Sequence, residues 1–330
     1  MKPRKTSKIR RSPRALRTVL AYDLGGTKVA IGVVSEKGKI LEEKRLPVPF
    51  EKGKDAVIEF LCKEGRDFLR RYPLIKNVGV ASAGPLDPRK GILLDPTNFS
   101  SAQGNWGKVP LVKLLSKGLK RKVFLENDAA AAILAEKWIG AAKSVKNSMI
   151  LTLGTGLGTG IIVNDQLVRC AHDLHPEGGH IILNWQDQTA PCGCGNLGCA
   201  EAYLSGRNFA RRARTRFANP DLTAKDITEL ARKRDPRAVA AFREYSEILA
   251  VAITSFVVLY APEKILFTGS FADAFELFAP ETRTHLERLL ARRRDGIDLM
   301  PRLEVSKLEN EAGLLGGAYV ALFEKESLRR

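Results

Sequence analysis

One segment of the chain, residues 172–206, places a histidine, His180, close to three cysteines in a glycine-rich stretch. His180, Cys192, Cys194 and Cys199 offer one imidazole and three thiols, with the cysteines spaced C-x-C-x₄-C. Such a closed set of four nitrogen and sulfur ligands is typical of structural rather than catalytic zinc. The segment therefore predicts a zinc ion that pins a loop, and free core thiols are the alternative. A disulfide is not expected in a chain without a secretory signal.

Carboxylates lie close to this segment and also after a predicted strand. Glu177 and Glu201 flank the ligand set, so a metal there would hold a binding site in place. Glu126-Asn127-Asp128 follows an apolar strand and opens an alanine-rich helix. Asn127 or Asp128 could be a helix N-cap and nothing more. Ligands also bind at the carboxyl ends of strands in open α/β sheets, so both interpretations stay open.

A glycine-rich turn near the start of the chain joins two apolar strands and reads D-x-G-G-T-K. Its glycines let backbone N–H groups approach a phosphate, while a hydroxyl and an ammonium group add donors. The aspartate at the strand end suits magnesium, directly or through water. Phosphate binding and a plain β-hairpin turn are the two interpretations. The residues concerned are Asp23, Gly25, Gly26, Thr27 and Lys28.

A second glycine loop is predicted over residues 154–160, G-T-G-L-G-T-G, because glycine at every other position weakens a strand. The loop does not fit G-x-G-x-x-G and does not open a helix, which disfavours a dinucleotide site. A P-loop motif does not occur in the chain. Two glycine turns in two halves could instead grip one polyphosphate. Thr268-Gly269-Ser270 is a weaker signal. A nucleotide base or ribose could lie against it, or it could be a simple β–α turn.

The elements around these motifs repeat, because a strand–glycine turn–strand unit occurs at 18–34 and again at 148–163. This pattern predicts an internal duplication with an α/β plan in each half. We expect a basic disordered tail, an N-terminal α/β domain and a C-terminal α/β domain that contains the zinc segment 177–206. The last helix, 311–325, can pack back on the N-terminal domain. The predicted limits are 1–17, 18–135 and 136–330.

The composition is that of an ordinary globular protein, with 330 residues, 44% hydrophobic and 28% charged. Neither a run of eighteen apolar residues nor an apolar signal region occurs, so a cytoplasmic protein without membrane contact is expected. The net charge of +17 is partly local, because residues 1–17 hold eight basic and no acidic residues. That tail is only a weak hint of nucleic-acid binding, and a solvated tail is the alternative.

These motifs occur in the order found in the ROK family (repressor, open reading frame, kinase), which the chain resembles over roughly residues 18–325. The stretch C-G-C-G-N-L-G-C-A-E-A-Y-L-S-G is the most specific part of the resemblance. The resemblance implies the actin/hexokinase-type ATPase fold, with two α/β domains and an active-site cleft between them. It also implies a kinase that uses ATP with Mg²⁺ to phosphorylate the 6-hydroxyl of a hexose, with structural Zn²⁺ and a homodimer or homotetramer. Glucose is the first choice, and an N-acetylhexosamine or fructose is the alternative.

The resemblance also assigns roles to single residues. Asp128 would be the catalytic base, and His180 would bind zinc with one ring nitrogen and could donate to the sugar with the other. The residues implied to bind the sugar are Gly84, Asn98, Asn127, Asp128, Glu177, His180 and Glu201. Those implied to bind Mg-ATP are Asp23, Gly25, Gly26, Thr27, Lys28, Gly154, Thr155, Gly156, Gly158 and Gly269.

Four positions depart from the usual family motifs. The family's G-E-x-G-H begins here with Pro176, and its P-G-P begins with Ala83. The asparagine common two residues after the catalytic aspartate is Ala130, and the paired glycines before the adenosine helix read Thr268-Gly269. None of these changes removes a residue with a chemical role, so they bear on which sugar fits rather than on activity.

Two other function classes compete with the kinase. The family includes sugar-responsive transcriptional repressors, but about seventeen residues precede the first strand, too few for a helix-turn-helix domain. A non-catalytic module that binds sugar or polyphosphate is disfavoured because Asp128 and the D-x-G-G-T-K residues are present.

Overall fold

The structure is a computed structural model that describes residues 16–96, 99, 106–291 and 296–323. The predictions for Asn98 and for nearly all of the basic tail lie outside the described residues. No helix in these described ranges is long and apolar enough to cross a membrane.

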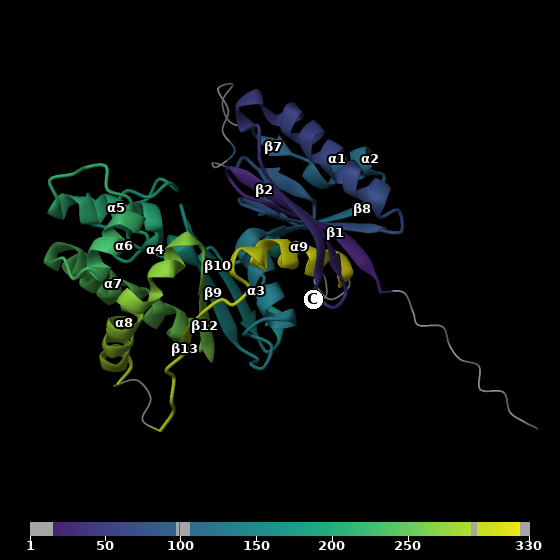
Figure 1. Ribbon diagram of the computed structural model, residues 1–330. Coiled ribbons are helices and arrows are strands. Elements are labelled where there is room, and N and C mark those ends of the chain that lie inside the picture. Colours follow the sequence, from purple (N-terminus) through teal and green to yellow (C-terminus); the bar gives the residue numbers. More distant parts are fainter. Residues whose placement is uncertain (1–15, 97–98, 100–105, 292–295, 324–330) are drawn as a thin grey trace, which may run out of the picture.

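The N-terminal half forms a five-stranded sheet in the order β3-β2-β1-β4-β8 (Figure 1). Strands β1, β2 and β3 pair antiparallel, whereas β4 and β8 continue the sheet in parallel with β1. The strand bounds are Thr18–Leu24 (β1), Lys28–Ser35 (β2), Ile40–Pro47 (β3), Asn77–Ser82 (β4) and Lys122–Asn127 (β8).

The C-terminal half repeats this plan in the order β11-β10-β9-β12-β13, with three antiparallel strands followed by two parallel ones. The predicted duplication is therefore confirmed, down to the direction of each strand. The strand bounds are Ser148–Leu153 (β9), Leu157–Val163 (β10), Gln166–Leu167 (β11), Lys264–Thr268 (β12) and Arg302–Val305 (β13).

The central strands are apolar on both faces because helices cover both sides of each sheet. In β1, Leu20, Tyr22 and Leu24 join the core under α1 and α2, while Val19 and Ala21 face α9. The helix bounds are Lys54–Arg71 (α1), Leu111–Leu119 (α2), Asp128–Trp138 (α3), Ala200–Leu204 (α4), Gly206–Ala213 (α5), Ala224–Arg232 (α6), Pro236–Tyr260 (α7), Phe275–Leu290 (α8) and Ala312–Leu322 (α9).

Helices α3 and α9 pack against each other between the two sheets (Figure 1). α3 follows β8 of the first sheet but packs on β10 of the second, and α9 follows β13 of the second sheet but packs on β1 and β4 of the first. Close approach needs small residues, since a Cβ on Gly316 would lie 2.2 Å from the carbonyl oxygen of Ala131. The proposed domain limit at 135 falls inside α3.

A small three-stranded sheet lies between β4 and α2. Its strands are Leu86–Asp87 (β5), Ile92–Leu94 (β6) and Lys108–Val109 (β7). They are two or three residues long, too short for any periodicity to be recognised in the sequence.

Candidate active site

The carboxyl ends of three strands meet at one edge of the first sheet. Leu24 of β1 lies opposite Ser82 of β4, and Ser82 lies opposite Asn127 of β8. The segments that leave these strands therefore lie side by side, although they are far apart in the sequence. The hairpin turn after β1 is closed by a hydrogen bond of 3.0 Å from Gly25 N to Lys28 O.

Asn127, rather than Asp128, is the N-cap of α3. Its Oδ1 accepts hydrogen bonds from Ala129 N at 2.9 Å and from Ala130 N at 3.1 Å. Its Nδ2 faces Gly84, where an added Cβ would lie 3.6 Å from that nitrogen. Asp128 is the first residue of the helix, so the capping interpretation does not account for an aspartate at this position.

Two buried carboxyl groups at this edge, those of Asp23 and Asp128, have raised pKa values. Burial, followed by the charge of Asp128, raises the pKa of Asp23 to about 7. Burial also raises the pKa of Asp128; the Ala129 N–H group and His175 oppose this rise. The charge of Glu177 adds to it. Carboxyl groups with raised pKa values are typical of functional sites, and a cation would favour their ionised forms.

Glu177 approaches this edge from the other domain and is held by His175. The His175 side chain is 6% exposed, and its Nε2 lies 3.2 Å from Glu177 Oε1. A Cβ on Gly84 would lie 3.8 Å from the same oxygen. Burial alone would raise the pKa of Glu177, but the hydrogen bond from His175 lowers it. Glu177 is therefore an ionised carboxylate beside Gly84 and close to Asp128.

Glu126 connects the strand end to the second domain. Its carboxylate is 1% exposed and forms an ion pair with Arg169, which follows β11. Glu126 Oε1 accepts hydrogen bonds from Arg169 Nη1 at 3.1 Å and from Asn127 N at 2.9 Å. Arg169 also donates to the carbonyl oxygen of Asp173 at 3.3 Å. The pair fixes the strand end relative to the segment that carries Glu177.

The structure brings together all four predicted metal ligands. His180 Nδ1 lies 3.4 Å from Cys192 Sγ, and Cys194 Sγ lies 3.7 Å from Cys199 Sγ. The four ligand atoms all lie within 4.8 Å of one another. Tetrahedral Zn–S bonds of about 2.3 Å separate the sulfur atoms by about 3.8 Å, so the set fits a zinc ion.

Glu201 lies between this ligand set and the second glycine turn. Its Oε2 accepts a hydrogen bond from Leu157 N at 3.0 Å, and its Oε1 lies 3.6 Å from Cys192 Sγ. A Cβ on Gly156 would lie 2.6 Å from Glu201 Oε2, so a side chain there would displace this carboxylate.

The second glycine turn is shorter than predicted, because β10 begins at Leu157 and leaves only residues 154–156 as the turn. Gly158 and Gly160 lie inside the strand, where α3 packs closely. A Cβ on Gly160 would lie 2.3 Å from the carbonyl oxygen of Ala129, and one on Gly158 would lie 3.1 Å from the Ala129 Cβ. The loop prediction over 154–160 was wrong because a strand accepts glycine where another backbone approaches it.

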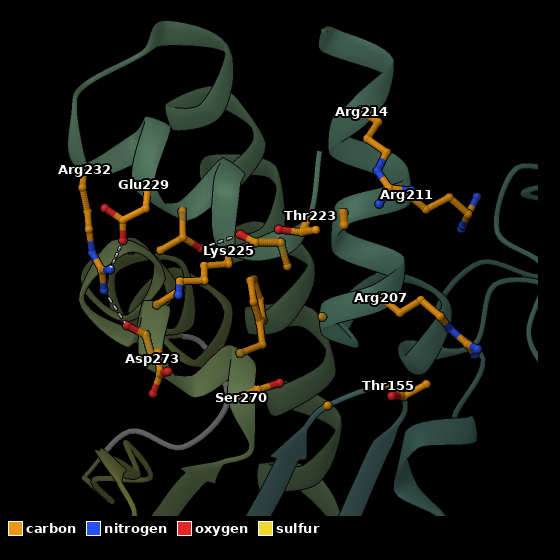
Figure 2. Close-up of a pocket in the computed structure, with 17 residues that line it drawn as sticks. Thr155, Arg207, Arg211, Arg214, Thr223, Lys225, Glu229, Arg232, Ser270 and Asp273 are labelled. Carbon is orange, nitrogen blue, oxygen red and sulfur yellow. Dashed lines mark hydrogen bonds and ion pairs between the residues drawn. The ribbon is translucent and has the colours of Figure 1, made fainter. Parts of the chain in front are cut away.

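A pocket of about 600 Å³ opens beside the shortened turn (Figure 2). Gly154 is among the lining residues, and Thr155 lies at the same end of the pocket as Ser270, which follows β12 and Gly269. Gly269 has a φ of +90°, and a Cβ there would lie 2.5 Å from the carbonyl oxygen of Leu153. The walls come from α5, the turn after it and α6, and they are rich in basic residues: Arg207, Arg211, Arg214, Lys225 and Arg232.

The predicted site residues thus fall into three connected groups. Gly84, Asn127, Asp128 and Glu177 lie together, with Asp23 close to Asp128. Glu177 leads to the second group, because its carbonyl oxygen accepts a hydrogen bond from His180 N at 2.9 Å. Glu201 joins that metal group to the third, which is formed by the turn 154–156 and the pocket.

Sequence reasoning missed His175 and Arg169. Both lie in or next to the segment that carries the metal ligands, but neither belongs to a motif with a known spacing. Their contacts with Glu177 and Glu126 exist only because the segment 169–180 meets the end of β8. The sole signal in the sequence was the position of His175, two residues before Glu177.

Comparison with known proteins identifies the family. A profile of the ROK family matches residues 19–324. The chain belongs to the ROK family. Among curated ROK relatives, a glucokinase of Thermotoga maritima is 31% identical over 92% of this chain and 96% of its own. An N-acetyl-D-glucosamine kinase of Citrobacter koseri is also 31% identical, over 91% of this chain and 98% of its own.

Solved structures show the same ROK fold, the actin/hexokinase-type ATPase fold. A ROK glucokinase of Streptomyces griseus, in complex with glucose and AMPPNP, has a TM-score of 0.76 and 30% identity, covering 93% of this chain and 99% of its own. A ROK transcriptional regulator has a TM-score of 0.80 and 25% identity, covering 94% of this chain and 79% of its own. The fold therefore occurs in both kinases and regulators, and the site must decide between them.

Proposed function

We propose that the protein is an ATP-dependent sugar kinase that phosphorylates the 6-hydroxyl of a hexose. The observation that carries the proposal is the position of Asp128. It lies at the carboxyl end of β8, with Asn127 and Glu177 beside it, and close enough to Asp23 for its charge to raise the pKa of that carboxyl group. Relatives named glucokinase and N-acetyl-D-glucosamine kinase support the reaction class.

In this proposal Asp128 orients the sugar hydroxyl and takes its proton late. Phosphoryl transfer requires mainly alignment of the acceptor oxygen and neutralisation of charge. Bound Mg²⁺ would neutralise charge on the transferred phosphoryl group. Asp23 would hold that ion directly or through water, with Lys28 and the N–H groups of the two glycine turns as donors to the phosphates. The pocket between α5 and α6 would hold the base and ribose of the nucleotide.

Zinc would have a structural role in the same proposal. Four close ligand atoms and no remaining ligand position are typical of a closed site. His180 turns Nδ1 toward Cys192, which leaves Nε2 as the nitrogen that could donate to a sugar hydroxyl. Glu201 lies against the same cysteine, so the metal would fix two sugar-binding side chains at once.

Glucose is the proposed preferred sugar, and an N-acetylhexosamine or fructose is the alternative. Because ATP is the proposed donor, the proposed location is the cytoplasm, and a homodimer or homotetramer is the proposed assembly. Glucose, mannose, fructose, N-acetylglucosamine and N-acetylmannosamine tested in an ATP-coupled assay decide the substrate. Calorimetry on the same sugars separates the classes. Turnover of at least one sugar supports the kinase, whereas binding without turnover would favour a sugar-responsive regulator and overturn the proposal.

A further inference from the structure

The backbone around Glu177 is held in place by one buried hydroxyl group, that of Thr159. Thr159 of β10 is 2% exposed, and its Oγ1 donates to the carbonyl oxygen of Pro176 at 2.8 Å. The same Oγ1 accepts a hydrogen bond from Gly178 N at 2.9 Å. Both neighbours of Glu177 are therefore anchored to the second sheet, and only the Glu177 side chain is left to be oriented.

His175 supplies that orientation. Its Nε2 lies 3.2 Å from Glu177 Oε1, and the imidazole is 6% exposed whereas the Glu177 side chain is 50% exposed. A hydrogen bond to a charged acceptor that is shielded from water on one side is stronger than an exposed one. Glu177 Oε2 has no hydrogen bond to any residue in the described ranges, so it remains available to a ligand.

We propose that His175 is a positioning residue of the sugar site. Its Nε2 donates a hydrogen bond to Glu177 Oε1, and Glu177 Oε2 is thereby left to accept a hydrogen bond from a hydroxyl of a neutral polyhydroxylated ring. This inference rests on the proposed sugar kinase function. Both the neutral Nε2–H tautomer and the imidazolium can make the bond, so the role does not depend on the protonation of His175.

Two variants of the full-length, zinc-loaded protein test the role. His175→Leu removes the donor and keeps a buried apolar group, whereas His175→Gln keeps an N–H donor. We expect His175→Leu to raise the KM for the preferred sugar about 10-fold or more, the effect of losing a hydrogen bond to a charged group. The KM for ATP should stay within about 2-fold, and His175→Gln should restore most of the sugar KM. The exposed His172, in the same segment, provides the control His172→Asn, with no expected effect.

A double-mutant cycle with Glu177→Gln tests whether His175 acts through Glu177. In that background, His175→Leu should change the sugar KM by less than about 2-fold, because the acceptor charge is already lost. A 10-fold effect that persists there, or equal losses in the Leu and Gln variants, would overturn the positioning role. An active wild type with an unaffected His175→Leu variant overturns only this inference. A wild type that neither binds nor phosphorylates any hexose overturns the proposed function as well.

Discussion

At the scale of the residue, Asp128 combines a place in the first turn of α3 with a position beside two other carboxyl groups. Asp128→Asn keeps the size of the side chain but removes its charge and basicity. We expect kcat to fall by at least about 10²-fold, the usual effect of losing a general base. Sugar affinity and melting temperature should change little, since Asn127 caps the helix and other side chains hold the ring.

Kinetics, sugar calorimetry and thermal melting on this single variant test the assignment. The exposed Asp221 lies before α6 and provides the matched control Asp221→Asn, with no change in any of the three. Turnover near the wild-type rate would remove Asp128 from the mechanism, whatever its effect on stability.

Asp23 makes the stability of the protein depend on pH. Its pKa is raised from 3.8 to about 7 in the folded protein. Between these values the folded state holds a proton that the unfolded state has lost, so the free energy of unfolding falls as pH rises from about 4 to about 7. Asp23→Asn removes this loss. The difference in melting temperature between Asp23→Asn and wild type should therefore be more favourable to the variant at pH 8 than at pH 4, by at least about 2 °C.

Melting curves at pH 4, 6 and 8 with and without Mg²⁺ test this dependence. Mg²⁺ should narrow the difference at pH 8, because a bound cation stabilises the ionised carboxylate. A difference between variant and wild type that stays constant across the pH range would contradict the assignment.

The predicted zinc site can be tested by replacing an exposed cysteine ligand. Cys194 is exposed, so Cys194→Ser should cost little in packing but should lower the zinc content well below one ion per chain. The sugar KM should rise, because His180 and Glu201 both adjoin the ligand set. Cys170 is also exposed but lies outside the set, so Cys170→Ser is the control. A fully active wild-type protein without metal would rule the site out.

At the scale of the element, the glycines of the turn 154–156 and those of strand β10 are expected to be needed for different reasons. Gly160→Ala places a Cβ 2.3 Å from a backbone oxygen of α3 and should lower stability by about 1–3 kcal/mol. A Cβ on Gly154 meets no atom within 4 Å, so Gly154→Ala should melt like wild type. If the turn binds phosphate, that variant should instead raise the KM for ATP, because the added carbon lies where the phosphate approaches.

Thermal melting and ATP kinetics on both variants separate packing from binding. A Gly154→Ala variant with a normal KM for ATP would mean that the turn does not need its glycine for a ligand.

Elements with long apolar runs were predictable, and short or tightly packed ones were not. The strand–glycine turn–strand units at 18–34 and 148–163 were recognisable because their continuous apolar runs are interrupted by glycine-containing turns. The start of β10 was missed because its glycines are explained by α3, a helix distant in the sequence. The motifs of the candidate site were recognisable locally. The contact of His175 with Glu177 was not, since no spacing rule encodes it.

At the scale of the whole molecule, the two crossing helices link the domains directly to the site. α3 begins at Asp128, and a Cβ on Gly313, near the start of α9, would lie 2.4 Å from Asp23 Cγ. Each helix follows one sheet and packs on the other. The carboxyl groups of Asp23 and Asp128 therefore lie where the two helices meet the edge of the first sheet.

The ion pair of Glu126 and Arg169 is a further link between the domains, and its contribution to stability can be measured. Arg169→Met leaves the Glu126 carboxylate buried, 1% exposed and without its cation. Removing one partner of a buried pair destabilises a protein by about 3–5 kcal/mol. Glu126→Gln in the same chain should recover much of this loss, because a neutral amide tolerates burial better and can still accept a hydrogen bond from Asn127 N.

Unfolding curves for the two single variants and the double variant measure this coupling. Arg89, an exposed residue that pairs with Asp173, provides the control Arg89→Met, with a loss below about 1 kcal/mol. The kinetic consequence follows from the geometry: once Glu126 is no longer held, the strand end that carries Asn127 and Asp128 is freer, and kcat should fall more than sugar affinity. Additive effects of the two substitutions on stability would show that the residues do not act as a pair.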